Sequence, residues 1–491
     1  MASTLPTFLR PRLNRSVRRA GWLSATLALA GGCAVGPNYH RPAVAAPAAF
    51  KEVEGWKQAS PADSSDRGPW WKAFNDPDLD ALEVQADLSN QTLKQAEANY
   101  EAARQLARAA DTALFPSVTA DGAASRSQSA RGPSLNPSPT MKNFSASLQA
   151  AWEPDFWGSV RRQTEANVAS AQASAAAVAN ARLSIHAAVA QDYIELRILD
   201  DNVHLLQNSI DAYRHSLSIT QNKYGVGVST RSDVLQAQTQ VDSTRAQMIA
   251  LGVQRAALEH AIAVLNGKAP EDFSIPARDA LGLAPLSLPP QLPSDLLERR
   301  PDIAEAEREV ASANASVGVR TAAYYPNVSL TAEGGFQGAI LHQLFTTPDR
   351  FWSLGASLSE SLFNYGQTRD LVKEAKANYD ASVANYRQTV LSAFEQVEDE
   401  LAALGILAQE AEVQSSAVKE SAQATVIALN EYKAGTVDYT TVVTAQVTEL
   451  NARETSLNVL ENRLTAGVTL MTALGGGWDA GQLPSSQAVL R

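Results

Sequence analysis

Cysteine, positive charge and long apolar runs are all scarce in this sequence of 491 residues. Its one cysteine cannot form an intramolecular disulfide, and neither this cysteine nor the six histidines stand at zinc-ligand spacing. The formal charge of −11 has the wrong sign for a protein that grips nucleic acid. A mean hydropathy of −0.18 argues against a bundle of membrane-spanning helices. Because no nucleophile motif or phosphate-binding loop is present either, we expect no enzyme activity, no cofactor and no metal.

The first 32 residues have the organisation of an export signal. Residues 1–19 hold five arginines and no acidic residue, and an apolar run of 11 residues follows at Ala20–Ala30, too short to span a membrane. The single cysteine, Cys33, comes after two glycines. It is either a free thiol after an ordinary signal or, as the resemblance of this segment to bacterial lipoprotein signals implies, a lipidated mature N-terminus. By the same resemblance, Ala34 at the next position favours the outer membrane. Removal of the signal would change the net charge from −11 to −16.

Landmarks recur along the chain at nearly constant spacing. Pro116 and Pro326 are 210 residues apart, whereas Tyr224 and Tyr432 are 208 apart, as are the pairs Trp157 and Tyr365, and Gly267 and Gly475. This constancy predicts a tandem duplication. We divide the chain into a signal (1–32), a lipidated extended segment (33–69), a first repeat (70–283), a proline-rich linker (284–293), a second repeat (294–476) and a tail (477–491).

Each repeat is expected to contain a helix, two strands, a very long helix, a glycine turn and another helix. Residues 159–224 lack both glycine and proline, and a seam of mainly apolar residues follows steps of three and four, as in a coiled coil. The seam consists of Leu196, Leu199, Val203, Leu206, Ile210, Tyr213, Leu217, Thr220 and Tyr224, with Thr220 as its one polar interior member. Such a helix would extend about 100 Å. The second repeat keeps the pattern less well, with Gly405 and Gln414 inside it.

Apolar and polar residues alternate in the strand candidates, which are roughly ten residues long, the length of a tilted transmembrane strand. The clearest alternation is in 144–152, 328–332 and 352–358, with polar loops at 126–142 and 337–350. A soluble hairpin would show the same alternation. In lipid, however, four strands cannot close and an open edge is not tolerated. Several copies must then share one barrel, and three copies would supply 12 strands, enough for a pore, whereas eight are usually filled by side chains.

Four segments resemble the outer-membrane factor family, which comprises TolC-like efflux channels, in its NodT-type or OprM-like lipoprotein branch. These segments are Cys33–Pro42, Trp70–Ala86, Ala151–Arg162 and Leu292–Leu330, and the resemblance extends to about Gly476. It implies an α+β, mainly α protomer of a homotrimer. Each protomer would give four strands to a 12-stranded outer-membrane barrel and long antiparallel helices to a periplasmic tunnel. It also implies a lipid-anchored channel that contacts outer-membrane lipid and works with a periplasmic adaptor and an inner-membrane RND-type pump. The cargo would be drugs or similar toxic solutes.

The resemblance places the turns at Gly225–Ser232 and Ala434–Asp438 at the periplasmic tip, where such channels are constricted and adaptors dock. Gly225, Gly227 and Gly435 are expected to provide the positive φ angle of a helix reversal. The gate candidates are Asp233, Asp438, Tyr439, Thr441 and Thr444.

Some gate candidates have a second interpretation. Helix N-capping is the alternative role of Asp233 and Asp438. As gate residues, three related carboxylates around an axis would repel one another and select cations. Thr441 and Thr444 stand where TolC-like channels carry an aspartate pair, and Val437 stands where they carry an arginine. Closure is therefore expected to depend on Asp438, Tyr439 and helix packing.

Two other functions fit parts of the pattern. A type I-like protein-secretion channel would have the same fold, but the lipoprotein signal and the motifs of the RND branch disfavour it. A periplasmic coiled-coil adaptor would need no barrel, and the duplicated strand pairs disfavour that alternative.

Overall fold

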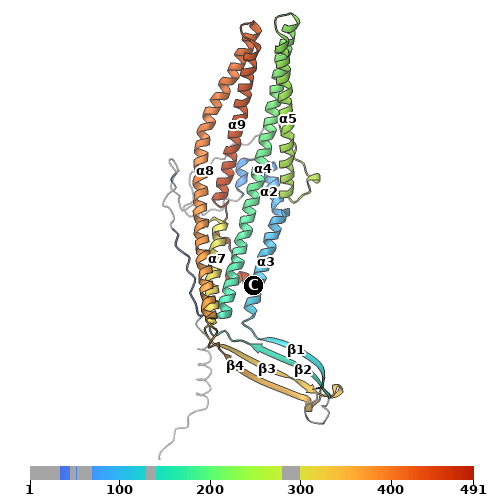
Figure 1. The fold of residues 1–491 in the computed structure, drawn as a ribbon, viewed down its shortest axis with the longest axis vertical. Coiled ribbons are helices and arrows are strands. Elements are labelled where there is room, and N and C mark those ends of the chain that lie inside the picture. The colour runs from blue at the N-terminus through green and yellow to red at the C-terminus, as the bar shows by residue number, and fades with distance from the viewer. Residues whose placement is uncertain (1–33, 45–50, 52–68, 129–139, 279–298) are drawn as a thin grey trace, which may run out of the picture.

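The computed structural model describes residues 34–44, 51, 69–128, 140–278 and 299–491, so the export signal, Cys33 and the linker at 284–293 lie outside the described residues. Figure 1 shows an elongated molecule with its helices along the long axis, two helical hairpin turns at one end and the strands at the other. The first repeat holds η2 (Trp70–Phe74), α2 (Pro77–Ser89), α3 (Gln91–Thr112), β1 (Ser117–Gln128), β2 (Thr140–Trp152), α4 (Ser159–Gly225), α5 (Arg231–Leu265) and η3 (Pro270–Asp272). The second holds α7 (Pro301–Ala322), β3 (Asn327–Gly338), η4 (Leu341–Gln343), η5 (Thr347–Asp349), β4 (Arg350–Ser359), α8 (Gln367–Ala434) and α9 (Tyr439–Ala473), followed by η6 (Ala480–Gln482) and α10 (Ser486–Leu490).

The two longest helices, α4 with 67 residues and α8 with 68, confirm the predicted long runs. Each begins after a glycine with positive φ, Gly158 at +79° and Gly366 at +87°, a conformation that residues with a Cβ atom adopt only with strain. Gly405 does not interrupt α8, and the polar seam residue Gln414 donates a hydrogen bond from Nε2 to the carbonyl of Ala452 on α9, 2.8 Å away.

The predicted seam of α4 is buried over most of its length. Val203 is half-buried, and the prediction is wrong for Tyr224, which is 44% exposed one residue before the helix ends. The remaining seven members are buried, including the polar Thr220. Near the tip, this seam packs against α5, α8 and α9, so the coiled-coil pattern holds the two hairpins of one chain together.

The strands form one antiparallel sheet in the order β1-β2-β3-β4, so the two repeats meet between β2 and β3. The strands are 12, 13, 12 and 10 residues long, and most exceed the predicted length because they continue into the predicted loops. β1 reaches Gln128 and β2 begins at Thr140, and the stretch between them lies outside the described residues. The second predicted loop contains the short turns η4 and η5.

The register gathers apolar residues on one face of the sheet. Leu148 is paired with Ala120 and Gly334, and Ala332 with Ala150 and Leu354, so these side chains share a face. The neighbouring residues Ser147, Glu333 and Ser353 lie on the opposite, polar face. Much of the apolar face is open to the surroundings, with Leu354 76% exposed.

One described helix, α5, is long and apolar enough to cross a membrane by those two criteria alone, with a mean hydropathy of 1.4 in its most apolar window. It forms an antiparallel hairpin with α4, and its Val234, Ala237 and Val241 are buried there. Leu235, Ile249 and Val253 on its outer side are exposed. The high hydropathy therefore reflects a helix with apolar residues on two sides, only one of which is covered within the chain.

Candidate functional site: the hairpin tip

The turns between α4 and α5 and between α8 and α9 lie at the same end of the molecule, far from the sheet (Figure 1). Side chains from these four helices form a shared apolar core that we call the tip cluster. It consists of Ile210, Tyr213, Leu217, Val234, Ala237, Val241, Tyr432, Tyr439 and Val442. The two hairpins of one chain are thus packed together close to their turns.

Tyr432, in the last turn of α8, makes the main polar contacts between the hairpins. Its hydroxyl donates to Thr220 Oγ1 on α4 over 3.2 Å and lies 3.4 Å from Ser229 Oγ. The ammonium of Lys223, also on α4, lies 4.2 Å from the centre of the Tyr432 ring and donates a hydrogen bond to the Tyr432 carbonyl oxygen. This cation therefore combines a cation–π contact with a bond to the carbonyl end of a helix, where positive charge is favourable.

Burial keeps two tyrosines of the tip cluster, Tyr213 and Tyr439, neutral. Desolvation, followed by the nearby Tyr432, Tyr213 and Asp233, raises the pKa of Tyr439 well above its ordinary value. Desolvation also raises the pKa of Tyr213 to about 12, although a hydrogen bond with Gln240 opposes the shift. Both phenols therefore keep their protons around neutral pH, and the Tyr213 hydroxyl donates to the carbonyl of Gln446 on α9 over 3.2 Å.

Two of the three predicted turn glycines have the expected conformation. Gly227 has φ +80° and Gly435 has φ +81°, and no described atom would lie within 4 Å of a Cβ added at either one. Gly225 differs from the expectation, because it is the last residue of α4 and does not have a positive φ. Within the predicted turn at Gly225–Ser232, the positive φ is therefore provided by Gly227.

Asp233 and Asp438 lie in different local environments. Asp233 is the third residue of α5 and completes a capping box: its carboxylate accepts from the Thr230 N–H over 2.9 Å, while the Thr230 hydroxyl accepts from the Asp233 N–H. Desolvation opposes its ionised form, but hydrogen bonds from Thr230 and Ser229 outweigh it and lower the pKa of Asp233. Asp438 occupies the N-cap position of α9, yet its side chain makes no capping hydrogen bond and is exposed.

The four predicted gate residues at the start of α9 therefore divide into two groups. Asp438, Thr441 and Thr444 are all exposed and recur every three residues, which places them on one side of α9. Tyr439 is 1% exposed and points into the tip cluster, where its ring meets that of Tyr432 at a centroid distance of 5.3 Å. Val437 is half-buried against the same cluster.

Sequence reasoning did not identify Lys223, Thr220 or Tyr432 as tip contacts. Two signals were present: Thr220 interrupts an otherwise apolar seam, and Tyr432 is the repeat partner of Tyr224. Their contact could not be inferred, because it depends on how two hairpins more than 200 residues apart in the sequence are packed.

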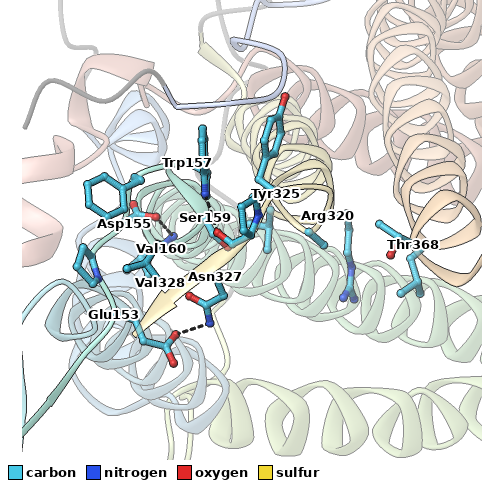
Figure 2. Close-up of a pocket in the computed structure, with 17 residues that line it drawn as sticks. Glu153, Asp155, Trp157, Ser159, Val160, Arg320, Tyr325, Asn327, Val328 and Thr368 are labelled. Atoms are coloured by element: carbon cyan, nitrogen blue, oxygen red, sulfur yellow. Dashed lines mark hydrogen bonds between the residues drawn. The ribbon is translucent and has the colours of Figure 1, made fainter. Parts of the chain in front are cut away.

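A second structured region joins the strands to the helices, and a cavity of about 380 Å³ lies within it. Figure 2 shows Trp157 beside Tyr325, and these rings stack at 4.8 Å. Trp157 Nε1 donates to the carbonyl of Pro326 over 2.8 Å, and Asn327 Nδ2 donates to Glu153 Oε2 over 3.2 Å. These contacts connect the end of β2 to the start of β3, so the two repeats also meet at the junction.

The fold and the tip define a class of protein. A family model described as outer membrane efflux protein matches residues 82–268 and 292–476, and the chain belongs to this family. The family resemblance, the mainly helical fold with a small antiparallel sheet, and the outer-membrane location predicted from the sequence are thereby confirmed. The protein is an outer-membrane efflux channel.

Named relatives cover nearly the whole chain. The toluene efflux pump outer membrane protein TtgC of Pseudomonas putida is 30% identical over 93% of this chain and 95% of its own. The pyoverdine export outer membrane protein OpmQ of Pseudomonas aeruginosa is also 30% identical, over 95% and 98%. The probable outer membrane lipoprotein SilC of Salmonella typhimurium is 28% identical over 93% and 98%.

Solved channels share the fold. The outer-membrane channel OprN matches with a TM-score of 0.84 and 30% identity, covering 91% of this chain and 100% of its own. The MtrE outer membrane channel of Neisseria gonorrhoeae, in its open state, matches with a TM-score of 0.80 and 27% identity, covering 91% and 99%.

Proposed function

We propose that three copies of the chain form a channel that passively conducts small toxic solutes, received from an RND-type inner-membrane pump and a periplasmic adaptor, to the cell exterior. The observation that carries this proposal is the sheet. β1 and β4 are its edges and pair with no further strand among the described residues, while one face of the sheet is apolar and exposed. Lipid tolerates such strands only in a closed barrel, and three copies would supply the strands for one with a pore.

The exposed apolar side of α5 supports the same assembly. Leu235, Ile249 and Val253 would be costly to leave in water, and α8 has exposed apolar residues of its own at Ile406 and Val413. In the trimer, helices of one subunit would cover those of the next, and edge strands of neighbouring subunits would pair in the same way. Heat-resistant trimers of the purified protein are expected in denaturing gels and in native mass spectra. Monomers under all conditions would contradict the assembly.

Cys33 is proposed to carry the lipid anchor. The chain directly after it is fixed at the strand–helix junction, where the Val35 N–H donates to the Trp157 carbonyl over 3.0 Å. Ala34 lies so close to Gly158 that a Cβ added at Gly158 would be 2.6 Å from the Ala34 side chain. A lipid on the preceding residue would then enter the membrane near the level where the strands begin. Radiolabelled palmitate should label the wild type and not Cys33→Ala.

The tip is proposed to be the gate and the adaptor-docking site. The contacts of Tyr432 with Lys223 and Thr220 hold the hairpins together, and separating the hairpins would widen the end of the conduit. Three copies of the exposed Asp438 near the axis would favour cations. The glycine turns at Gly225, Gly227 and Gly435 would be the surface that an adaptor meets.

The relatives support export of small solutes, since the name of one specifies toluene and that of another specifies pyoverdine. A strain lacking this protein should accumulate a fluorescent dye and become sensitive to drugs or solvents, and the plasmid-borne gene should reverse both effects. Unchanged accumulation and susceptibility would contradict efflux of small solutes. A defect confined to a secreted protein would favour a secretion channel instead.

A further inference from the structure

The buried Glu83 and His186, together with the exposed Asp87, join α2 to α4 in the helical part of the molecule, away from both the tip and the sheet (Figure 1). Glu83 on α2 is fully buried, and its Oε2 lies 2.6 Å from Nδ1 of His186 on α4. The other ring nitrogen, Nε2, lies 3.3 Å from Oδ1 of Asp87, one helical turn further along α2. The Trp71 ring of η2 stacks on the imidazole at 4.4 Å. His186 is therefore held between two carboxylates and beneath an indole.

Further charges surround this group. Arg182 on α4 lies 3.1 Å from the carboxylate of Asp87 and 3.8 Å from that of Glu97 on α3. Asp80 adds another negative charge from α2. Asp87 is thus shared between a guanidinium and the imidazole, whereas Glu83 has the imidazole as its partner.

The position of Glu83 favours its protonated form. Its Oε1 is buried and accepts no hydrogen bond from the described residues, so an ionised carboxylate would leave half of its charge without a donor. A protonated Glu83 can donate from Oε2 to Nδ1 of His186, and the imidazole can then donate from Nε2 to Asp87. If Glu83 loses that proton, the neutral imidazole has a single N–H and can donate a hydrogen bond to only one of the two carboxylates. The other carboxylate then faces the lone pair of the second ring nitrogen.

The pKa shift agrees with this geometry. Desolvation raises the pKa of Glu83 to about 7, the negative charges of Asp87 and Asp80 act in the same direction, and the contacts with His186 oppose them.

We propose that Glu83, His186 and Asp87 form a proton-operated clamp, which fastens η2 and α2 to α4 and tightens as the surrounding solution becomes more acidic. The clamp borders a large apolar core in which Leu79 and Ala86 of α2 pack with Ile185 and Val189 of α4. The protonation state of Glu83 therefore determines how strongly η2 and α2 are held against α4. The proposal depends neither on trimer formation nor on the cargo.

The direction of the effect follows from linkage. Glu83 binds its proton more tightly in the folded than in the unfolded state, so the stabilisation is complete below the ordinary value of 4.5 and is lost as the pH rises through about 7. Between pH 8 and pH 6, the population in which α2 is detached should fall about ten-fold.

Hydrogen exchange of the full-length protein in detergent tests the clamp. After correction for intrinsic exchange, amides of α2 should be protected about ten-fold more at pH 6 than at pH 8, relative to amides of α9 near the tip. Glu83→Gln keeps the shape of the side chain but cannot titrate, so this pH dependence should disappear. Glu101→Gln, on the exposed surface of α3, should keep it. Equal α2 protection at both pH values, or a Glu83→Gln protein that retains the difference, would overturn the proposal.

Discussion

The ammonium group of Lys223 lies over the ring of Tyr432 and donates a hydrogen bond to its carbonyl oxygen, which joins the last turn of α4 to the last turn of α8. Tyr432 also donates from its hydroxyl to Thr220. These contacts connect the two repeats at the end of the molecule furthest from the sheet (Figure 1). A cation–π contact and hydrogen bonds of this kind each contribute about 1 kcal/mol.

Lys223→Met should loosen the tip. The substitution keeps most of the aliphatic stem but removes the ammonium, so a loss of about 1.4 kcal/mol would raise the ratio of open to closed channels about ten-fold. Planar-bilayer recordings at low voltage should show more frequent or longer openings. Lys433→Met, at an exposed position beside Tyr432, is the matched control and should behave like the wild type. Equal open probabilities for all three proteins would show that Lys223 does not hold the gate.

Asp233 and Asp438 should respond differently to replacement by alanine. Asp233→Ala removes half of a capping box and should destabilise the protein by about 1 kcal/mol, with little change in ion selectivity. Asp438→Ala removes no capping bond, so stability should hardly change, while the preference for cations should fall. Thermal unfolding and reversal potentials in a salt gradient measure the two effects. If Asp438→Ala alters stability and leaves selectivity intact, its carboxylate is not near the axis.

The capping box also predicts an effect of acid. Because the pKa of Asp233 is lowered in the folded protein, its stabilisation is present above the ordinary value of 3.8 and is lost as the pH falls through the lower folded-state value. The stability difference between the wild type and Asp233→Asn should therefore shrink as the pH falls below about 4. Unfolding experiments at pH 6 and pH 3 measure this difference. A constant difference would mean that ionisation of Asp233 does not contribute.

Gly435→Ala should destabilise the folded protein more than Gly225→Ala does. Gly435 has φ +81° with open space around it, so the penalty is one of backbone strain alone, about 1–2 kcal/mol. Gly225 ends a helix with ordinary φ, so alanine there should be neutral or slightly stabilising. The thermal unfolding midpoints of the two variants provide the comparison. An equal decrease of the unfolding midpoint in both variants would contradict the argument that only Gly435 needs a positive φ.

Patterns within one element were enough to predict the long helices and the alternating strands. The absence of glycine and proline from 159–224 and the spacing of Leu206, Ile210 and Leu217 describe α4 without any knowledge of its neighbours. The duplication similarly predicted the matching pair of hairpins. Strand ends were harder to predict, because Arg126 and Lys142 are polar and yet continue the ladder as a register pair.

Contacts between helices that are far apart in the sequence could not be predicted, because they depend on how those helices pack. Lys223 with Tyr432, and Glu83 with His186, are pairs from separate helices. Each residue alone resembles an ordinary helix-surface residue. The gate candidates on α9 came instead from the family resemblance, and the structure separates Tyr439, which is buried, from the exposed Asp438.

The two faces of the sheet give the most direct test of which side meets lipid. Leu148 and Ser147 are neighbours on the central strand β2 but point to opposite faces. Leu148→Arg would place a charge among hydrocarbon chains and should destabilise the barrel by about 2–4 kcal/mol. Ser147→Arg would place the same charge in the aqueous interior and should be tolerated. The yield of heat-resistant trimers in outer-membrane fractions should therefore fall for Leu148→Arg alone. Loss of trimers with Ser147→Arg and normal yield with Leu148→Arg would mean that the polar face meets the lipid, which would contradict the proposed barrel.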